Sequence, residues 1–326
     1  MVTTMKILCI HQWGTSGVVF EKQLSSVTGL LSPTYEYVYI NGPYTCARAR
    51  GLPDTVNGPF HCWYRGLSSE QCNEAHKVIC EAIAEDGPFE GVIAFSQGAA
   101  TILSLLLHHD MHQPSQPPPF RFAILFCPIV VISPDPKFNA EHVVRYSRYY
   151  KAKHAGDRIN DDTTEGFVEE AENVGEAIGS RPRYGTVSKP KSVPKHRTLL
   201  LLRRKREALA EEMVDLVREM SSMAPAEMDE ETTVRAKDMV SPDKPEAFPR
   251  IMHPLTTKSR VSIPTVVVVG KEDPFARQSE LAVRLCENKR TKVVYLAGSH
   301  RVPVSPPELH AVTAAVEWAI QKSQQT

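Results

Sequence analysis

Three residues of this sequence have the side chains and the chain order that nucleophilic acyl transfer requires. Ser96 lies in the stretch VIAFSQGAA, Asp273 in VVVVGKEDPF and His300 in YLAGSHRVP. A serine hydroxyl is a poor nucleophile at neutral pH, so it needs a base to take its proton and an acid to orient that base. The order serine, aspartate, histidine therefore predicts a catalytic triad, with His300 as the base and Asp273 as the orienting acid.

Each of the three residues also has an ordinary structural interpretation. Ser96 precedes a predicted helix, and serine is favoured as the residue that caps a helix N-terminus. Asp273 stands before a proline, a pair that suits a turn or a helix start, and Glu272 is the alternative acid. His300 alone would be interpreted as a surface loop histidine. The catalytic prediction rests on all three occurring just past the ends of predicted strands, where open α/β sheets carry functional groups.

The residues around Ser96 are close to the G-x-S-x-G turn that presents a catalytic serine. Gly98 supplies the second small residue, and Ala94 stands where the first glycine would be. The flanking positions must be small because the serine backbone is strained and the following helix packs close to the strand. One additional methyl group at Ala94 weakens this motif without breaking it.

Two backbone N–H groups must face the negative charge that develops during acyl transfer. We predict that Gln97, the residue after the nucleophile, supplies one of them. The loop HQWGTSG supplies the other, from Trp13 or alternatively from Gln12, with His11 supporting the loop. Side chains predicted to line the substrate pocket are Gln12, Tyr146, Tyr149 and Tyr150, although the helical spacing of the tyrosines also suits packing within a cap.

Apolar runs and helical patterns alternate over most of the chain. Short runs that are apolar on both faces predict strands buried on both sides of a parallel sheet, at residues 5–10, 37–40, 91–95, 122–126, 264–269 and 292–296. Helical patterns lie between them, at residues 18–31, 69–85, 97–109, 277–288 and 307–322. This alternation predicts an α/β fold with a doubly wound, mostly parallel sheet.

The alternation stops in the middle of the chain. Residues 135–262 are charged and contain few strand-like runs, with predicted helices at 140–153, 165–178 and 198–223. Because strands of the same predicted sheet flank this segment, we expect a helical cap or lid inserted into a core formed by residues 1–134 and 263–326.

Composition narrows the classes of partner and compartment. The 38 lysines and arginines balance the 38 aspartates and glutamates, so no overall field favours nucleic acid. The seven cysteines form no C-x-x-C pair, and we expect reduced thiols in a cytoplasmic protein. No apolar run is long enough to predict a membrane span. No pattern of histidine, cysteine and carboxylate predicts a metal site, and no motif predicts a cofactor.

The sequence blocks resemble the fungal serine hydrolase (FSH) family of α/β-hydrolases. The resemblance rests on ILCIHQWGTSGVVFEKQ, YVYINGP, PFEGVIAFSQGAA, FRFAILFCP, IPTVVVVGKEDP and LAGSHRVP, and it leaves the charged insertion largely unmatched. It implies triad roles for Ser96, Asp273 and His300, and oxyanion roles for Trp13 and Gln97. It also implies kinship with polyketide-releasing thioesterases. Ala94 and Gln12 differ from the glycines usual in the family.

The leading hypothesis is a serine esterase or thioesterase that releases or trims an acyl or polyketide chain in fungal secondary metabolism. Its partner would be a small-molecule or carrier-bound acyl (thio)ester, with an acyl-carrier domain of a polyketide synthase as a possible second partner. The basic run Arg203–Arg206 is interpreted first as a solvated helix face. Docking of an acidic carrier domain and a nuclear localisation signal are the alternatives for this run. The alternative is a catalytically silent binding protein of the same pathway, motivated by Gln12. A third hypothesis is that the same pocket catalyses another acyl or carbon–carbon bond reaction.

Overall fold

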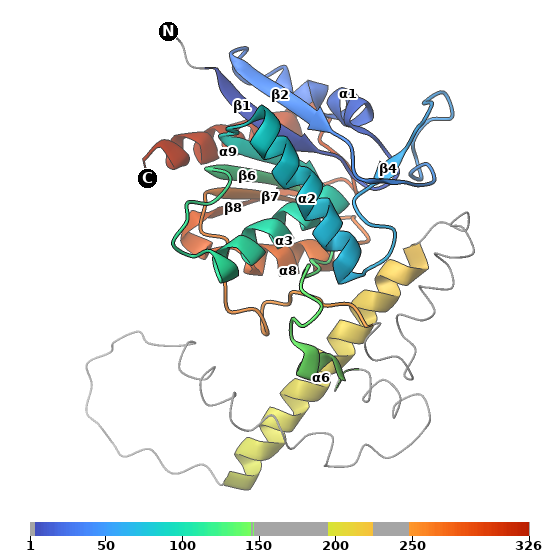
Figure 1. Cartoon of the computed structure of the whole chain (residues 1–326), viewed down its shortest axis with the longest axis vertical. Coiled ribbons are helices and arrows are strands. Elements are labelled where there is room, and N and C mark those ends of the chain that lie inside the picture. Colours follow the sequence, from blue (N-terminus) through green and yellow to red (C-terminus); the bar gives the residue numbers. More distant parts are fainter. Residues whose placement is uncertain (1–3, 145, 147–194, 224–247, 326) are drawn as a thin grey trace. The chain divides into compact units, whose positions relative to one another are not determined.

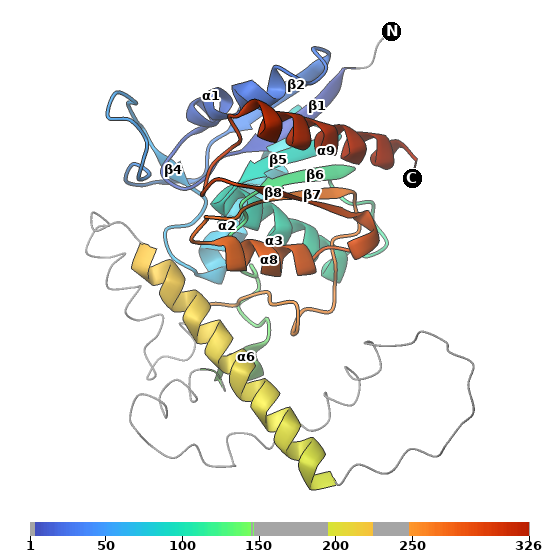
Figure 2. The same ribbon diagram turned by 180° about the vertical axis from the view of Figure 1, so that it is seen from behind.

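A six-stranded parallel sheet forms the core of the larger of two compact units of the chain (Figures 1 and 2). The computed structural model describes residues 4–144, 146, 195–223 and 248–325. The strand order is β2-β1-β5-β6-β7-β8, and each neighbouring pair is parallel. The strands are β1 (Met5–Ile10), β2 (Tyr35–Ile40), β5 (Gly91–Phe95), β6 (Phe122–Phe126), β7 (Thr265–Gly270) and β8 (Thr291–Leu296). The predicted doubly wound parallel sheet is confirmed.

The central strands are buried at every position because their sequences are apolar on both faces. β5, β6 and β7 read GVIAF, FAILF and TVVVVG, and none of their residues is exposed. The edge strand β8 instead alternates buried and exposed residues at its end. Burial on both faces fixes these strands in the middle of the sheet, which places their carboxyl ends side by side.

Helices cover both faces of the sheet. α1 (Gly17–Thr28) and α9 (Pro306–Gln324) lie on one face, where their apolar side chains join a core cluster with β1, β5, β6 and β7. α2 (Ser69–Asp86), α3 (Gln97–His112) and α8 (Ala276–Arg284) lie on the other face. A 3₁₀ turn (Asn288–Arg290) precedes β8. Because all six strands are parallel, the loops that follow their carboxyl ends, including those that carry Ser96, Asp273 and His300, lie at one edge of the sheet.

A short hairpin that the sequence patterns did not reveal lies between β2 and α2. β3 (Tyr44–Thr45) pairs antiparallel with β4 (His61–Cys62), and His61 also forms a bridge with Thr15. The hairpin therefore joins the loop that follows β1 to the segment before α2.

The chain divides into two compact units. The first contains residues 1–139, 223–236 and 249–326, and the second contains residues 140–222 and 237–248. Residues 249–262, which we expected in the insertion, belong to the first unit, because Ile251 bridges to Ile132 and Val261 to Cys286. The cap role of the insertion stays a prediction.

One long helix dominates the described part of the second unit. α6 (Lys195–Met223) buries Ala210, Met213, Leu216 and Val217 along one stripe, as expected for the predicted helix at 198–223. Residues 140–144 and 146 are also helical, within the helix predicted at 140–153. The predicted helix at 165–178, Tyr149 and Tyr150 lie outside the described residues, as do the side chains of Arg203, Arg204 and Arg206.

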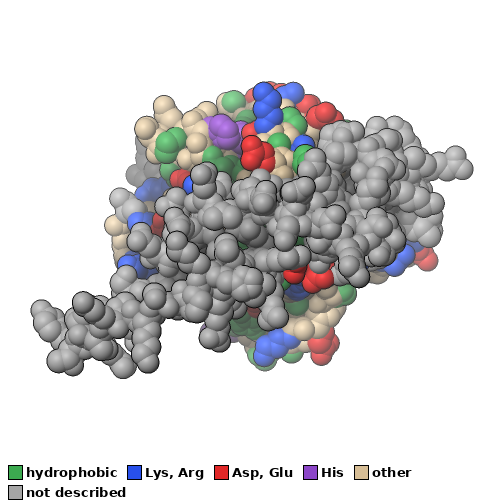
Figure 3. Space-filling model, turned by 90° about the horizontal axis from the view of Figure 1, so that it is seen from below, with side chains coloured by type: hydrophobic (Ala, Val, Ile, Leu, Met, Phe, Trp, Pro, Cys, Tyr) green, Lys and Arg blue, Asp and Glu red, His purple; other side chains and the backbone are tan. Residues whose placement is uncertain are grey.

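Surface charge is mixed on the face seen in Figure 3. Basic and acidic side chains of the described residues are interspersed there, in agreement with the balanced composition. Among the helices that the structure describes, none has the length and apolar character needed to span a bilayer.

Candidate active site

Ser96 stands on a sharp turn between β5 and α3. Its backbone has φ 54° and ψ −116°, a conformation that side chains other than glycine rarely adopt. The Ser96 N–H donates to the carbonyl oxygen of Phe126 at 2.8 Å, which ties the turn to the end of β6. Strain of this kind persists only where the surrounding structure enforces it, and it is frequent at functional sites.

The small residues near Ser96 are required by close packing. A Cβ atom on Gly98 would lie 2.5 Å from the His11 carbonyl oxygen and 2.6 Å from that of Ile10. Because both contacts are with backbone, no side-chain movement would relieve them. Ala94 is fully buried within β5, so its methyl group is accommodated in the core. The substitution of the first glycine of the motif is therefore compatible with the turn.

Ser96, His300 and Asp273 form a continuous hydrogen-bonded chain. The distance from Ser96 Oγ to His300 Nε2 is 2.7 Å, and the distance from His300 Nδ1 to Asp273 Oδ2 is 2.8 Å. The Ser96 side chain makes no cap hydrogen bond to α3. Its hydroxyl faces the imidazole instead, in the geometry of a nucleophile paired with a general base.

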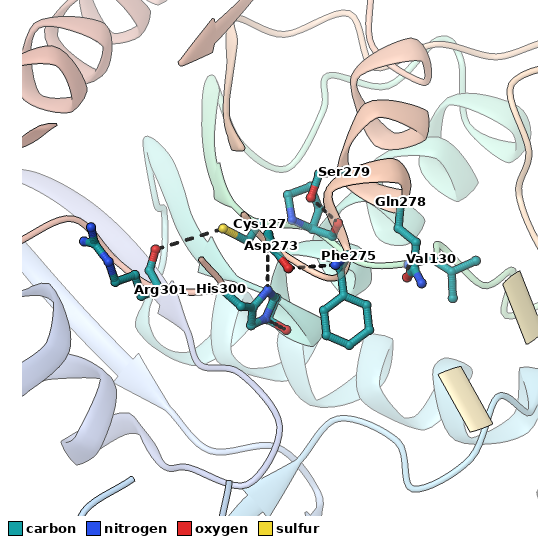
Figure 4. A network of polar contacts seen from close by, with 10 residues as sticks. Cys127, Val130, Asp273, Phe275, Gln278, Ser279, His300 and Arg301 are labelled. Carbon is teal, nitrogen blue, oxygen red and sulfur yellow. Dashed lines mark hydrogen bonds and ion pairs between the residues drawn. The ribbon is translucent and has the colours of Figure 1, made fainter. Parts of the chain in front are cut away.

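Asp273 is the buried carboxylate of this chain. Its side chain has no solvent exposure, and Oδ1 accepts a hydrogen bond from the Phe275 N–H at 2.8 Å (Figure 4). The neighbouring Glu272 is exposed. A buried carboxylate must be hydrogen-bonded, and here both oxygens have donors, one of which is the imidazole Nδ1–H. The structure thus brings Asp273, and not Glu272, to the histidine.

Two aromatic rings flank the imidazole of His300. The ring centroid of Phe95 lies 5.2 Å from that of His300 in a stacked arrangement, and that of Phe275 lies 5.0 Å away at a tilt. These rings limit the rotation of His300 and keep its two nitrogens aimed at Ser96 and Asp273. A fixed orientation is what lets one imidazole act on a single reacting proton.

The loop after β1 is braced by the buried ring of His11. The Gly42 N–H donates to His11 Nε2 at 3.0 Å, so Nδ1 carries the ring proton and donates it to the Gln12 carbonyl at 2.6 Å. Burial lowers the pKa of His11 to about 4, which keeps the ring neutral. Gly14 turns the loop with φ 70°, and a Cβ there would lie 2.5 Å from Ala49 N.

Gln97 and Trp63 connect this loop to the nucleophile turn, and sequence reasoning missed both contacts. Gln97 Oε1 accepts from the Trp63 N–H at 2.9 Å, and Gln97 Nε2 donates to the Tyr64 carbonyl at 2.7 Å. The indole N–H of Trp63 donates to the His11 carbonyl at 2.8 Å. The only feature of the sequence that could have indicated these contacts was a tryptophan in the segment FHCWYRG, between two predicted elements.

The predicted oxyanion donors are the backbone N–H groups of Trp13 and Gln97. Within the described residues, neither the Trp13 nor the Gln97 backbone N–H donates to a protein acceptor. Gln12 and Trp13 are partly exposed, whereas Gln97 is buried. Tyr146, predicted to line the pocket, is buried in the second unit.

Several known proteins resemble this chain in sequence. Residues 1–159 match the family model described as Serine hydrolase (FSH1). Esterase alnB of Emericella nidulans is 29% identical, with 98% of this chain and 98% of that protein covered. Esterase FPY3 of Fusarium mangiferae is 38% identical over 38% of this chain and 56% of its own length. A carboxylesterase structure from Mesorhizobium loti aligns with a TM-score of 0.44 at 10% identity, covering 97% of this chain and 89% of that one.

Proposed function

Because this chain belongs to the serine hydrolase (FSH1) family and is a serine esterase, we propose that Ser96, Asp273 and His300 are its catalytic triad. In this proposal the enzyme cleaves an ester or thioester through an acyl-enzyme intermediate. The observation that carries the proposal is the hydrogen-bonded chain from Ser96 Oγ through His300 to Asp273, with distances of 2.7 and 2.8 Å.

Acylation begins at the Ser96 hydroxyl. His300 Nε2 takes the hydroxyl proton while Oγ forms a bond to the substrate carbonyl carbon, and Asp273 stabilises the imidazolium that results. The Gln97 and Trp13 N–H groups face the oxyanion; removal of one oxyanion donor costs on the order of 3 kcal/mol of the barrier in a serine protease of another fold. The intermediate then collapses, its bond to the alcohol or thiol breaks, and His300 Nε2–H protonates the leaving group.

Deacylation repeats these proton transfers with water. His300 Nε2 takes a proton from a water molecule as its oxygen attacks the acyl carbon. The bond from the acyl carbon to Ser96 Oγ then breaks, and His300 returns the proton to the serine. The free acid leaves and the enzyme returns to its starting state.

The substrate proposed is an acyl or polyketide chain of fungal secondary metabolism, presented as a small (thio)ester or on an acyl-carrier domain. The resemblance of the sequence blocks to a fungal family that includes polyketide-releasing enzymes supports this choice. Similarity to Esterase alnB over nearly the whole chain supports the esterase chemistry. The proposed location is the cytoplasm, because all seven cysteines are free thiols, as expected in a reducing compartment.

The test compares wild type with Ser96→Ala on p-nitrophenyl esters and on pantetheine thioesters of matched acyl groups. Ser115→Ala, at an exposed serine outside the site, is the matched control. We expect Ser96→Ala to lower kcat by about 10⁶-fold with an unchanged circular dichroism spectrum, while the control retains full turnover. A fluorophosphonate probe should label Ser96 once per chain. Retained turnover in Ser96→Ala would refute the proposed triad, and a folded wild type that resists labelling would favour a silent binding protein.

A further inference from the structure

A third polar side chain meets the triad at the ends of the central strands. Cys127 follows β6 directly, and its Sγ lies near Asp273 and His300 (Figure 4). The ligand atoms of Cys127, Asp273 and His300 all lie within 4.8 Å of one another. In the part of the chain that the structure describes, this is the only group of three such residues that meets so closely. Sequence spacing could not reveal it, because each residue comes from a different strand.

The backbone holds Cys127 firmly in this position. Its φ is 44°, in the left-handed region, where a cysteine is strained and a glycine would not be. The Cys127 N–H donates to the Val268 carbonyl at 2.8 Å, while the preceding carbonyl of Phe126 accepts from Ser96. The thiol is thus pinned between the strand of the nucleophile and the strand of the acid. A buried cysteine is often only a small apolar residue. Here its sulfur lies within 4.8 Å of a carboxylate oxygen and an imidazole nitrogen, and it contacts the Arg301 carbonyl oxygen at 4.0 Å.

We propose that Cys127 Sγ, Asp273 Oδ2 and His300 Nδ1 form a binding site for Zn²⁺ or a similar thiophilic divalent cation, and that the bound cation inhibits the enzyme. Thiolate, imidazole and carboxylate are the three ligand types that zinc prefers, and tetrahedral sites commonly use three protein ligands with water in the fourth position. Zinc bonds of about 2.0–2.3 Å place ligand atoms roughly 3.5 Å apart. The three atoms therefore need to move by only about 1 Å.

The chemical consequence follows from the tautomer of His300. Without metal, Nδ1 carries the ring proton toward Asp273 and Nε2 is free to accept the proton of Ser96. A cation on Nδ1 displaces that proton, which the ring can then carry only on Nε2. The Cys127 thiol loses its own proton to solvent as the metal–sulfur bond forms. Nε2 then has no lone pair for the serine proton, and acylation stops.

The inference that the cation inhibits rests on the proposed triad, whereas the inference that it binds does not. Binding is therefore measured in Ser96→Ala, which lacks the nucleophile and keeps all three ligands. Isothermal titration of this variant with ZnCl₂ should show a site that disappears in Ser96→Ala/Cys127→Ser. MgCl₂ should give no heat at this site, because magnesium prefers oxygen ligands. His112→Ala, which removes one ring of a close pair of tilted histidine rings, His108 and His112, controls for zinc bound elsewhere.

Inhibition is measured with a p-nitrophenyl ester, each variant being compared with its own rate in EDTA. We expect Zn²⁺ to inhibit wild type and His112→Ala equally, and EDTA to reverse the inhibition. Half-inhibition of Cys127→Ser should require a zinc concentration more than about ten-fold higher, because even the loss of a residue that only hydrogen-bonds to a metal ligand has an effect of that size. Equal sensitivity of wild type and Cys127→Ser, or zinc binding unaffected by Cys127→Ser, would overturn the inference. Full turnover in Ser96→Ala would refute the proposed triad instead.

Discussion

Substitution of Gln97 tests whether one side chain holds the nucleophile turn to the segment before α2. Gln97 Oε1 accepts from the Trp63 N–H, and Gln97 Nε2 donates to the Tyr64 carbonyl. Trp63 is fully buried and Tyr64 is 2% exposed, so water cannot replace either bond. Gln97→Ala leaves two buried polar groups without partners. At about 1–3 kcal/mol for each group, we expect the free energy of unfolding to fall by about 2–6 kcal/mol.

Gln97→Glu distinguishes the contributions of the two hydrogen bonds to stability. The introduced carboxyl has nearly the same shape and still accepts from the Trp63 N–H, but it donates to the Tyr64 carbonyl only when it is protonated. Burial and this hydrogen bond both favour the protonated form, so the pKa of the introduced group is raised in the folded state. The unfolded state then releases a proton that the folded state keeps. The deficit relative to wild type should therefore grow as pH rises above about 4.3, by about 1.4 kcal/mol per pH unit until the raised pKa is reached.

The assay is urea unfolding followed by far-ultraviolet circular dichroism at pH 5, 6, 7 and 8. The quantity of interest is the difference in unfolding free energy between each variant and wild type at the same pH. Gln97→Ala should show a difference that hardly changes with pH, whereas Gln97→Glu should approach wild type at pH 5 and separate from it at pH 8. If Gln97→Ala is as stable as wild type, or if the Gln97→Glu deficit is independent of pH, the bracing role of the amide is wrong.

Three further predictions concern the triad, the oxyanion loop and acid stability. Asp273→Asn should lower kcat on p-nitrophenyl esters by about 10⁴-fold with the fold retained, because the amide favours the wrong tautomer of His300; a loss below ten-fold would contradict this. Trp63→Phe removes the indole donor to the His11 carbonyl and should cost about 1–3 kcal/mol of stability in urea unfolding, together with a lower kcat; unchanged values for both would contradict it. Burial lowers the pKa of His11 from 6.5 to about 4 and that of His76 to about 3. Below pH 6.5 the unfolded state therefore binds more protons than the folded state. The free energy of unfolding should fall between pH 6.5 and 4, by about 3 kcal/mol from His11 alone. His76→Gln should reduce this loss of stability on acidification. If the free energy of unfolding of wild type does not change between pH 6.5 and 4, the two histidines are not buried in the neutral form.

The sheet could be predicted from the sequence because its signal is local. Each central strand is an uninterrupted apolar run, and the predicted bounds of β1, β5 and β6 coincide with the observed ones. Once the strands are parallel neighbours, their carboxyl ends must meet at one edge. The convergence of Ser96, Asp273 and His300 on that edge followed from topology, without any knowledge of side-chain geometry.

The supports of the site could not be predicted, because they join residues that no periodicity connects. Gln97 and Trp63 lie 34 positions apart, and Trp63 and His11 lie 52 apart. Cys127 belongs to an apolar run and gives the same sequence signal as any buried thiol. Its left-handed backbone and its approach to Asp273 exist only after three strands have paired. Residues 249–262 likewise belong to the first unit through isolated β-bridges, such as that of Ile251 with Ile132, which no sequence pattern indicates.

The residue at position 12 matters less to the oxyanion loop than its difference from the family pattern suggests. A glycine is required where the backbone has positive φ or another chain segment approaches closely, and in this loop both conditions fall on Gly14. Among the described residues other than glycine, only Ser96, Cys127 and Asn139 have positive φ, so Gln12 adopts its conformation without such strain. The loop is held through the His11 ring and through backbone atoms, with the Gln12 carbonyl itself accepting from His11. Gln12 can therefore alter what the site binds without moving the Trp13 N–H.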